Sequence, residues 1–167
     1  EISDYDYIAG LKSFQDGMYQ IQDISSMLAG EYTAPKAGDT IVDVCGAPGG
    51  KSINAALKMS EQGDCGRVIA RDLSDYKVAL IDENIKRLNI TNIQTQVYDA
   101  LDCDESLINK ADIVIADLPC SGLGIIGRKP DIKYNASPEK LQSLVDLQRD
   151  ILKVVSRYVK SGGVLMY

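Results

Sequence analysis

The chain has 167 residues, of which 45% are hydrophobic and 25% charged, as in an ordinary globular domain. No apolar run approaches the roughly 20 residues of a membrane-spanning helix, and no signal-peptide pattern opens the chain, so we expect a cytoplasmic location. The formal net charge of −6 argues weakly against nucleic-acid binding by overall charge. Any nucleic-acid site must therefore be a local basic patch or lie on polypeptide outside these residues.

The sequence contains no histidine, which excludes Ser-His-Asp and Cys-His catalysis and histidine-based metal sites within these residues. Its cysteines form no C-x-x-C pair, so no metal site is expected, and without a secretory signal no disulfide framework is expected either. Each cysteine is therefore read as a small, reduced, half-buried residue. Only Cys120 has a sequence context that suggests more; the others are Cys45, Cys65 and Cys103.

Residues 1–38 are expected to form a lead-in and one helix. The first 20 residues read as irregular, since their aromatic side chains follow no helical period. Residues 22–31 predict a helix with Ile24, Met27 and Leu28 on one face, and Pro35 and Gly38 end that unit.

From residue 39 onward, apolar strands alternate with helical patterns, which predicts an α/β fold with a parallel sheet and right-handed crossovers. Ser74 and Ser137 are expected to cap helices. Gly162 and Gly163 are expected to end the second of these helices, just before a fifth strand. The expected strands are residues 41–44, 67–71, 93–98, 111–116 and 164–167; residues 51–61 are an expected helix, 105–109 a short helix or turn, and 118–135 a long loop. Because the chain stops inside the fifth strand, we expect a fragment cut within its own sheet.

The stretch IVDVCGAPGGKS, residues 41–52, predicts a strand, a tight glycine-proline loop and a helix start. Its glycines permit close backbone approach, and the free amides of a helix start favour a carboxylate or phosphate. A phosphate-binding Walker loop would need a glycine where Cys45 stands, and a dinucleotide loop would need one where Pro48 stands. S-adenosylmethionine is the third option: its carboxylate would bind the loop amides, and its ribose would bind Asp72 after the next strand.

Single acidic residues occur at four expected strand ends, namely Asp43, Asp72, Asp99 and Asp117. One such residue alone is an ordinary helix cap, but four in register favour a nucleoside-like ligand at the carboxyl edge of the sheet. Asp72 could accept from ribose hydroxyls, and Asp99 could accept from an adenine amino group.

The stretch DLPCSG joins the carboxyl group of Asp117 to the thiol of Cys120 on one loop. Cytosine carbon 5 becomes nucleophilic when a thiolate adds to carbon 6 while a carboxyl group binds nitrogen 3 and the amino group. The alternative for Cys120 is a buried turn cysteine. The basic cluster that follows, Arg128, Lys129 and Lys133, could contact phosphates or could be a solvated loop.

These motifs occur in one order: FQDGMYQIQDISSML, DVCGAPGGKS, ARD at residues 70–72, DLPCSGLG and RKPDIKY. From about Phe14 to Tyr167 the chain therefore resembles the Nol/Nop/Sun family of RNA cytosine-5 methyltransferases, and most of all its bacterial Sun/Fmu type, which acts on small-subunit rRNA. The resemblance implies a class I (Rossmann-like) methyltransferase fold, with residues 39–167 as its core, and S-adenosyl-L-methionine as cofactor. The implied donor contacts are Cys45, Gly46, Ala47, Pro48, Gly49, Gly50, Lys51, Asp72, Asp99 and Asp117.

In that family, the cysteine that matches Cys120 helps to release the product, and the nucleophile follows the fifth strand in a Thr-Cys pair. The resemblance thus implies that the nucleophile and an RNA-recruiting domain lie outside this chain, which would bind the donor weakly without turnover. The sequence departs from the family pattern at Gly46, Tyr98, Leu118 and Gly127. Two other readings stay open: a P-loop-like nucleotide-binding protein that uses residues 50–52, and a non-catalytic RNA-binding module.

Overall fold

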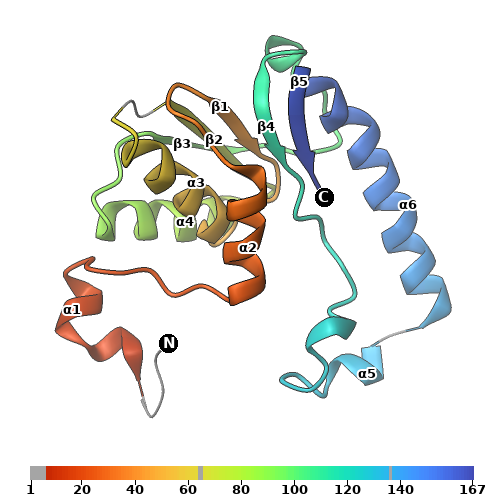
Figure 1. Cartoon of the computed structure of the whole chain (residues 1–167). Helices are drawn as coiled ribbons and strands as arrows, with labels where there is room; N and C mark the ends of the chain where they lie inside the picture. The colour runs from red at the N-terminus through yellow and green to blue at the C-terminus, as the bar shows by residue number, and fades with distance from the viewer. Residues whose placement is uncertain (1–6, 64–65, 136) are drawn as a thin grey trace.

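The computed structural model describes residues 7–63, 66–135 and 137–167, so Cys65 lies outside the described residues. Five strands form one parallel sheet in the order β3-β2-β1-β4-β5 (Figure 1). The predicted parallel α/β sheet is confirmed. The strands are β1 (Thr40–Asp43), β2 (Arg67–Asp72), β3 (Ile93–Val97), β4 (Ala111–Ile115) and β5 (Val159–Met166).

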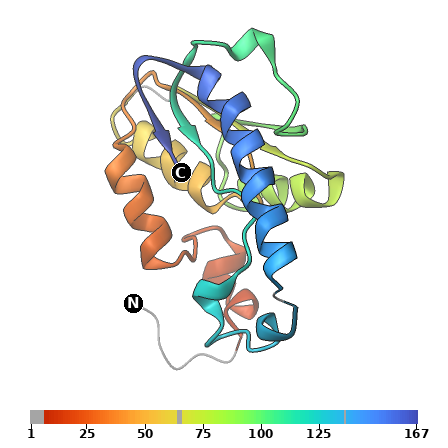
Figure 2. The same ribbon diagram turned by 90° about the vertical axis from the view of Figure 1, so that its right-hand side faces the viewer.

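Helices cover both faces of this sheet. Helices α3 (Gly50–Ser60) and α4 (Asp75–Arg87) lie on one side, and α6 (Pro138–Val155) lies on the other (Figures 1 and 2). Successive side chains of β1 point to opposite faces of the sheet. Ile41 packs in the core under α3, and Val42 packs in the core under α6. A central strand buried on both faces is what a parallel sheet requires. No helix in the described ranges is long and apolar enough to cross a membrane.

The lead-in is more ordered than predicted. From Tyr7 onward it contains η1 (Ile8–Gly10) and α1 (Lys12–Gln15), so the expectation of an irregular segment is wrong. The reason is a contact across the sequence: the Arg87 guanidinium of α4 donates to the carbonyls of Phe14 and Tyr19, each at 3.0 Å. Residues 118–135 likewise contain η3 (Leu123–Ile125) and α5 (Ile132–Asn135) rather than a plain loop.

Helix α2 (Ile24–Thr33) lies two residues later than predicted, and its expected apolar face is not buried. The exposed fractions of Ile24, Met27 and Leu28 are 73%, 46% and 47%. The Ser137 hydroxyl caps α6 by accepting from the Lys140 amide at 3.3 Å. Ser74 stands at the N-cap of α4 without a side-chain cap bond.

The junction between α6 and β5 corrects the predicted boundary. The helix ends at Val155, η4 (Ser156–Tyr158) follows, and β5 begins at Val159, four residues before the second predicted stop glycine. Strand β4 draws these residues into the sheet, pairing Ala111 with Val159 and then, after an irregularity, Ile113 with Val164. Gly162 takes its left-handed φ of 79° within this irregular stretch, so the glycines accommodate a break in strand pairing rather than a helix end.

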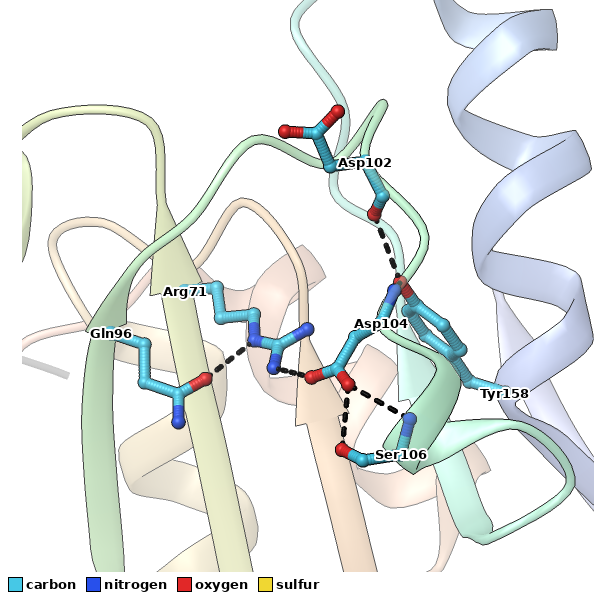
Figure 3. A network of polar contacts seen from close by, with 6 residues as sticks. All are labelled: Arg71, Gln96, Asp102, Asp104, Ser106 and Tyr158. Carbon is cyan, nitrogen blue, oxygen red and sulfur yellow. Dashed lines mark hydrogen bonds and ion pairs between the residues drawn. The ribbon is translucent and has the colours of Figure 1, made fainter.

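A polar network fixes the loop between β3 and β4 (Figure 3). The buried Arg71 guanidinium bonds Gln96 Oε1 at 2.8 Å and forms an ion pair with Asp104. Its carbon Cζ also lies 4.1 Å from the centre of the Tyr98 ring. The Tyr158 hydroxyl accepts from the Asp104 amide at 2.9 Å and donates to the Asp102 carbonyl at 3.2 Å. This loop carries Asp99, so the network sets where that carboxylate stands.

We expect Tyr158→Phe to lower the free energy of unfolding by about 1–3 kcal/mol, since it removes two part-buried hydrogen bonds, to the Asp104 amide and to the Asp102 carbonyl. The hydroxyl is the only atom removed from a side chain that is 1% exposed. Urea denaturation measures the change, with Tyr134→Phe as control, because that ring is 78% exposed. Equal unfolding midpoints for Tyr158→Phe and the parent chain would contradict this role of the hydroxyl.

Candidate active site

Three carboxylates at the ends of three neighbouring strands hold the loop between β1 and α3. Asp43 Oδ2 accepts from Ser52 Oγ at 2.6 Å, and Asp72 Oδ2 accepts from the Ala47 amide at 3.1 Å. Asp117, two residues beyond β4, pairs with Lys51 Nζ at 2.6 Å. Strand β1 lies between β2 and β4. The loop is therefore held by Asp43 from β1 itself, by Asp72 from β2 on one side and by Asp117 after β4 on the other.

The loop amides are largely used inside the protein. Besides the Ala47 amide, the Gly46 amide donates to the Arg71 carbonyl at 2.8 Å, and the Gly49 amide donates to the Gly46 carbonyl at 2.6 Å. Gly49 adopts φ 102°, a left-handed conformation that favours glycine, next to a cis Ala47-Pro48 bond. The first turn of α3, which starts at Gly50, therefore offers the amides that an anionic group could accept from.

A cavity of about 310 Å³ opens beside this loop. Lys51 of the glycine loop and Asp117 of the DLPCSG loop both line it. Residues 20–23 and Ser26 form one wall of the cavity, which the sequence did not predict. The only signal for this wall is that its residues belong to the upstream motif of the resemblance. The lining residues are Gln20, Ile21, Gln22, Asp23, Ser26, Asp43, Cys45, Gly46, Ala47, Pro48, Gly50, Lys51 and Asp117.

Three of the predicted donor contacts do not line this cavity: Gly49, Asp72 and Asp99. Asp72 is 3% exposed, and its Oδ1 accepts from the Leu73 amide at 2.8 Å and pairs with Lys77 at 3.0 Å. Asp99 accepts from the Leu101 amide at 2.9 Å in the turn after β3. Asp72 thus supports the loop from beneath, and the ligand contacts predicted for it and for Asp99 stay predictions.

A second cavity, of about 530 Å³, lies along the loop that follows Asp117. Cys120 is exposed and lines it, so the buried-turn reading of this cysteine is wrong. Of the predicted basic cluster, Arg128 and Lys129 line the cavity. Lys133 does not; its Nζ lies 4.8 Å from the centre of the Tyr134 ring. The full lining is Cys120, Ser121, Arg128, Lys129, Pro130, Asp131, Ile132, Lys140, Leu141 and Leu144.

Lys140 is the basic residue that the sequence analysis missed. It lies in the first turn of α6, which the Ser137 cap starts right after the basic loop. The two cavities meet at an ion pair between Arg128 Nη1 and Asp23 Oδ1, 3.0 Å apart, since Arg128 lines one cavity and Asp23 the other.

Burial sets the protonation of two groups at the first cavity. Desolvation raises the pKa of the Asp43 carboxyl to about 6, against the hydrogen bond from Ser52 and the charge of Lys51, which both lower it. Desolvation, followed by the charges of Asp72 and Asp43, raises the pKa of the Cys45 thiol to about 12. The Cys45 thiol is therefore neutral near pH 7. Within the described residues, no cluster of histidine, cysteine or acidic residues could hold a metal ion.

A family model described as "16S rRNA methyltransferase RsmB/F" matches residues 31–167. A relative from Bacillus subtilis, a probable ribosomal RNA small subunit methyltransferase B, is 42% identical over 161 residues. That alignment covers 96% of this chain and 35% of the relative, so the chain spans about a third of the length of such curated proteins.

Two solved structures have folds similar to that of this chain. PH0851 superposes with a TM-score of 0.89 at 30% identity, over 98% of this chain and 36% of that one. NSun6 from Pyrococcus horikoshii, solved with SFG, superposes with a TM-score of 0.83 at 29% identity, over 96% of this chain and 40% of that one. The predicted class I methyltransferase fold is confirmed.

We expect Asp43→Asn to remove a pH-dependent destabilisation. The folded pKa of about 6 exceeds the ordinary carboxyl pKa of 3.8, so the stability that the proton supplies is complete below pH 4 and lost as the pH rises through 6. The difference between these pKa values corresponds to a loss on the order of 3 kcal/mol by pH 7.

Urea unfolding from pH 4 to pH 7 measures this effect. The stability of Asp43→Asn relative to the parent chain should rise with pH across that range. Parallel pH profiles for the parent chain and Asp43→Asn would show that Asp43 is not a buried titrating group.

Proposed function

Since this chain belongs to the RsmB/F family of 16S rRNA methyltransferases, we propose that it carries the donor site and part of the RNA site of an enzyme that methylates carbon 5 of cytosine in small-subunit rRNA. One observation carries the proposal. The cavity beside the glycine loop and the cavity beside Cys120 adjoin, and the DLPCSG loop contributes Asp117 to the first and Cys120 to the second.

S-adenosyl-L-methionine is the cofactor of this family, and it supplies a methyl group on a positively charged sulfur. The residues present fit its amino-acid end, because the first turn of α3 offers free amides and Gly50 has no side chain there. Asp72 and Asp99 are proposed to accept from the ribose and the adenine amino group. The remaining proposed contacts are those of residues 45–51 and Asp117.

The target cytosine is proposed to lie in the second cavity, where Leu141 and Leu144 offer an apolar surface to the base. Lys129 and Lys140 beside it are proposed to contact phosphates of the RNA. Arg128 is proposed to do the same, because its ion pair with Asp23 is solvent-exposed and weak enough to be exchanged for a phosphate. Lys133, which does not line the cavity, is also proposed to contact the RNA.

Asp117 binds Lys51 through Oδ2, which leaves Oδ1 to accept from the cytosine amino group. Cys120 is the thiol proposed to assist product release, because it is exposed beside the base. Cys45 is unsuited to any thiolate step, since its pKa of about 12 keeps it protonated.

The nucleotide-triphosphate reading receives no support from this geometry. A phosphate-binding lysine must be free to reach the phosphates, whereas Lys51 is paired with Asp117 and also bonds Ser26 Oγ at 3.4 Å. A carboxylate at that place would repel a triphosphate.

We expect the chain to bind S-adenosylhomocysteine, and Gly50→Val to weaken that binding about tenfold to a hundredfold, because the new side chain overfills the cavity. A Cβ on Gly50 would stand 3.6 Å from its nearest neighbour, Gln22 Nε2, which is an ordinary van der Waals contact for the first added carbon. Isothermal titration measures the affinity, with Gly124→Val as control, since open space surrounds Gly124. Binding of Mg·ATP in place of S-adenosylhomocysteine would refute the donor site.

For the RNA site, Lys129→Ala should weaken binding of a small-subunit rRNA fragment and reduce the salt slope of the affinity by about 1, the signature of one lost phosphate contact. Lys110→Ala is the matched control, because that exposed lysine precedes β4 at the opposite edge of the sheet. Filter binding at several salt concentrations gives both slopes. Identical slopes for Lys129→Ala and the parent chain would place the RNA elsewhere.

A further inference from the structure

Two buried polar atoms without a hydrogen-bond partner belong to residues of the same cavity. Among the described residues, Gln22 Nε2 and Asp43 Oδ1 are both shielded from solvent and unpaired, and both residues line the cavity beside the glycine loop. One is an N–H donor and the other is a carboxylate acceptor. Leaving such groups unpaired costs about 1–3 kcal/mol each, so a ligand that pairs with both atoms would gain affinity from them.

The two atoms lie at different parts of the loop. Gln22 stands over the start of α3: a Cβ on Gly50 would be 3.6 Å from Gln22 Nε2. Asp43 stands under the loop, where a Cβ on Gly46 would be 3.1 Å from Asp43 Oδ2. Ser52 donates to that Oδ2, and the Cys45 backbone amide also stabilises the carboxylate, while Oδ1 has no hydrogen-bond partner among the described residues.

The chemistry of the missing partner follows from the two atoms. Gln22 Nε2 needs an acceptor and lies beside the free amides of a helix start, a place that favours an anion. Asp43 is 1% exposed, and a buried carboxylate is best stabilised by a cationic donor. A carboxylate and an ammonium on one carbon atom meet both needs, and that group is the free end of an α-amino acid.

We propose that Gln22 and Asp43 recognise the amino-acid end of the donor, with its carboxylate accepting from Gln22 Nε2 and its ammonium donating to Asp43 Oδ1. This inference rests on the proposed function, because it names the part of the donor that the cavity selects. It gives the lead-in a role in specificity: Gln22 precedes the first strand, yet it decides whether a nucleoside with an amino-acid tail is preferred over one without.

The test compares two ligands that differ in that tail, S-adenosylhomocysteine and 5′-methylthioadenosine, by isothermal titration on the 167-residue chain. The variants are Gln22→Met, which keeps the length of the side chain and removes the amide, and Asp43→Asn, which keeps an acceptor for Ser52 and removes the charge. Gln94→Met, on an exposed residue of β3, is the matched control.

The expected result is a loss of about tenfold or more in affinity for S-adenosylhomocysteine in both variants, with the affinity for 5′-methylthioadenosine unchanged. Equal losses for the two ligands, or no loss for S-adenosylhomocysteine in Gln22→Met, would overturn the inference while leaving the donor site in place. If the parent chain bound neither ligand, the proposed function would fall, and this inference with it. Gln22→Met decides the matter if Asp43→Asn does not fold.

Discussion

The pairing of β1 with a parallel strand on each side is the constraint on which the site depends. Asp43 at the end of β1 is level with Ala70 of β2 and with Ile115 of β4, so the chain leaves three neighbouring strands at one edge. The strand order places β1 where the sheet topology reverses, which is where open α/β sheets bind ligands. The glycine loop, its carboxylate supports and the DLPCSG loop meet there because of this register.

The acidic residues at the strand ends hold the glycine loop in place. As single residues they suggested ligand acceptors, but Asp43, Asp72 and Asp117 each bind a protein group in or just beyond the glycine loop. Such a loop is preorganised: its own amides are satisfied before any ligand arrives, and little conformational entropy is left to lose on binding. Selectivity then falls to the groups that remain unpaired at the cavity, which come partly from the lead-in.

The strands and helices of the sheet could be predicted from the sequence because each one has a local signal. Apolar runs mark the strands, turn residues mark their ends, and Ser137 marks the start of α6. Of the predicted loop residues 45–51, all but Gly49 line one cavity, together with Asp117. Prediction from the sequence failed where contacts between distant residues decide the structure. Arg87 orders the lead-in, β4 draws Val159 into the sheet before the glycines, and α6 returns Lys140 to the basic loop. No local pattern carries that information, and the same holds for Lys133, whose charge turns to Tyr134 rather than to the cavity.

A crystal structure of the chain with S-adenosylhomocysteine tests the central claim most directly. We expect electron density for the ligand in the cavity beside the glycine loop, with its amino-acid end at the first turn of α3 between Gln22 and Asp43, and with the Lys51–Asp117 pair intact. Density in the cavity beside Cys120 alone, or a ligand held with Lys51 released from Asp117, would contradict it.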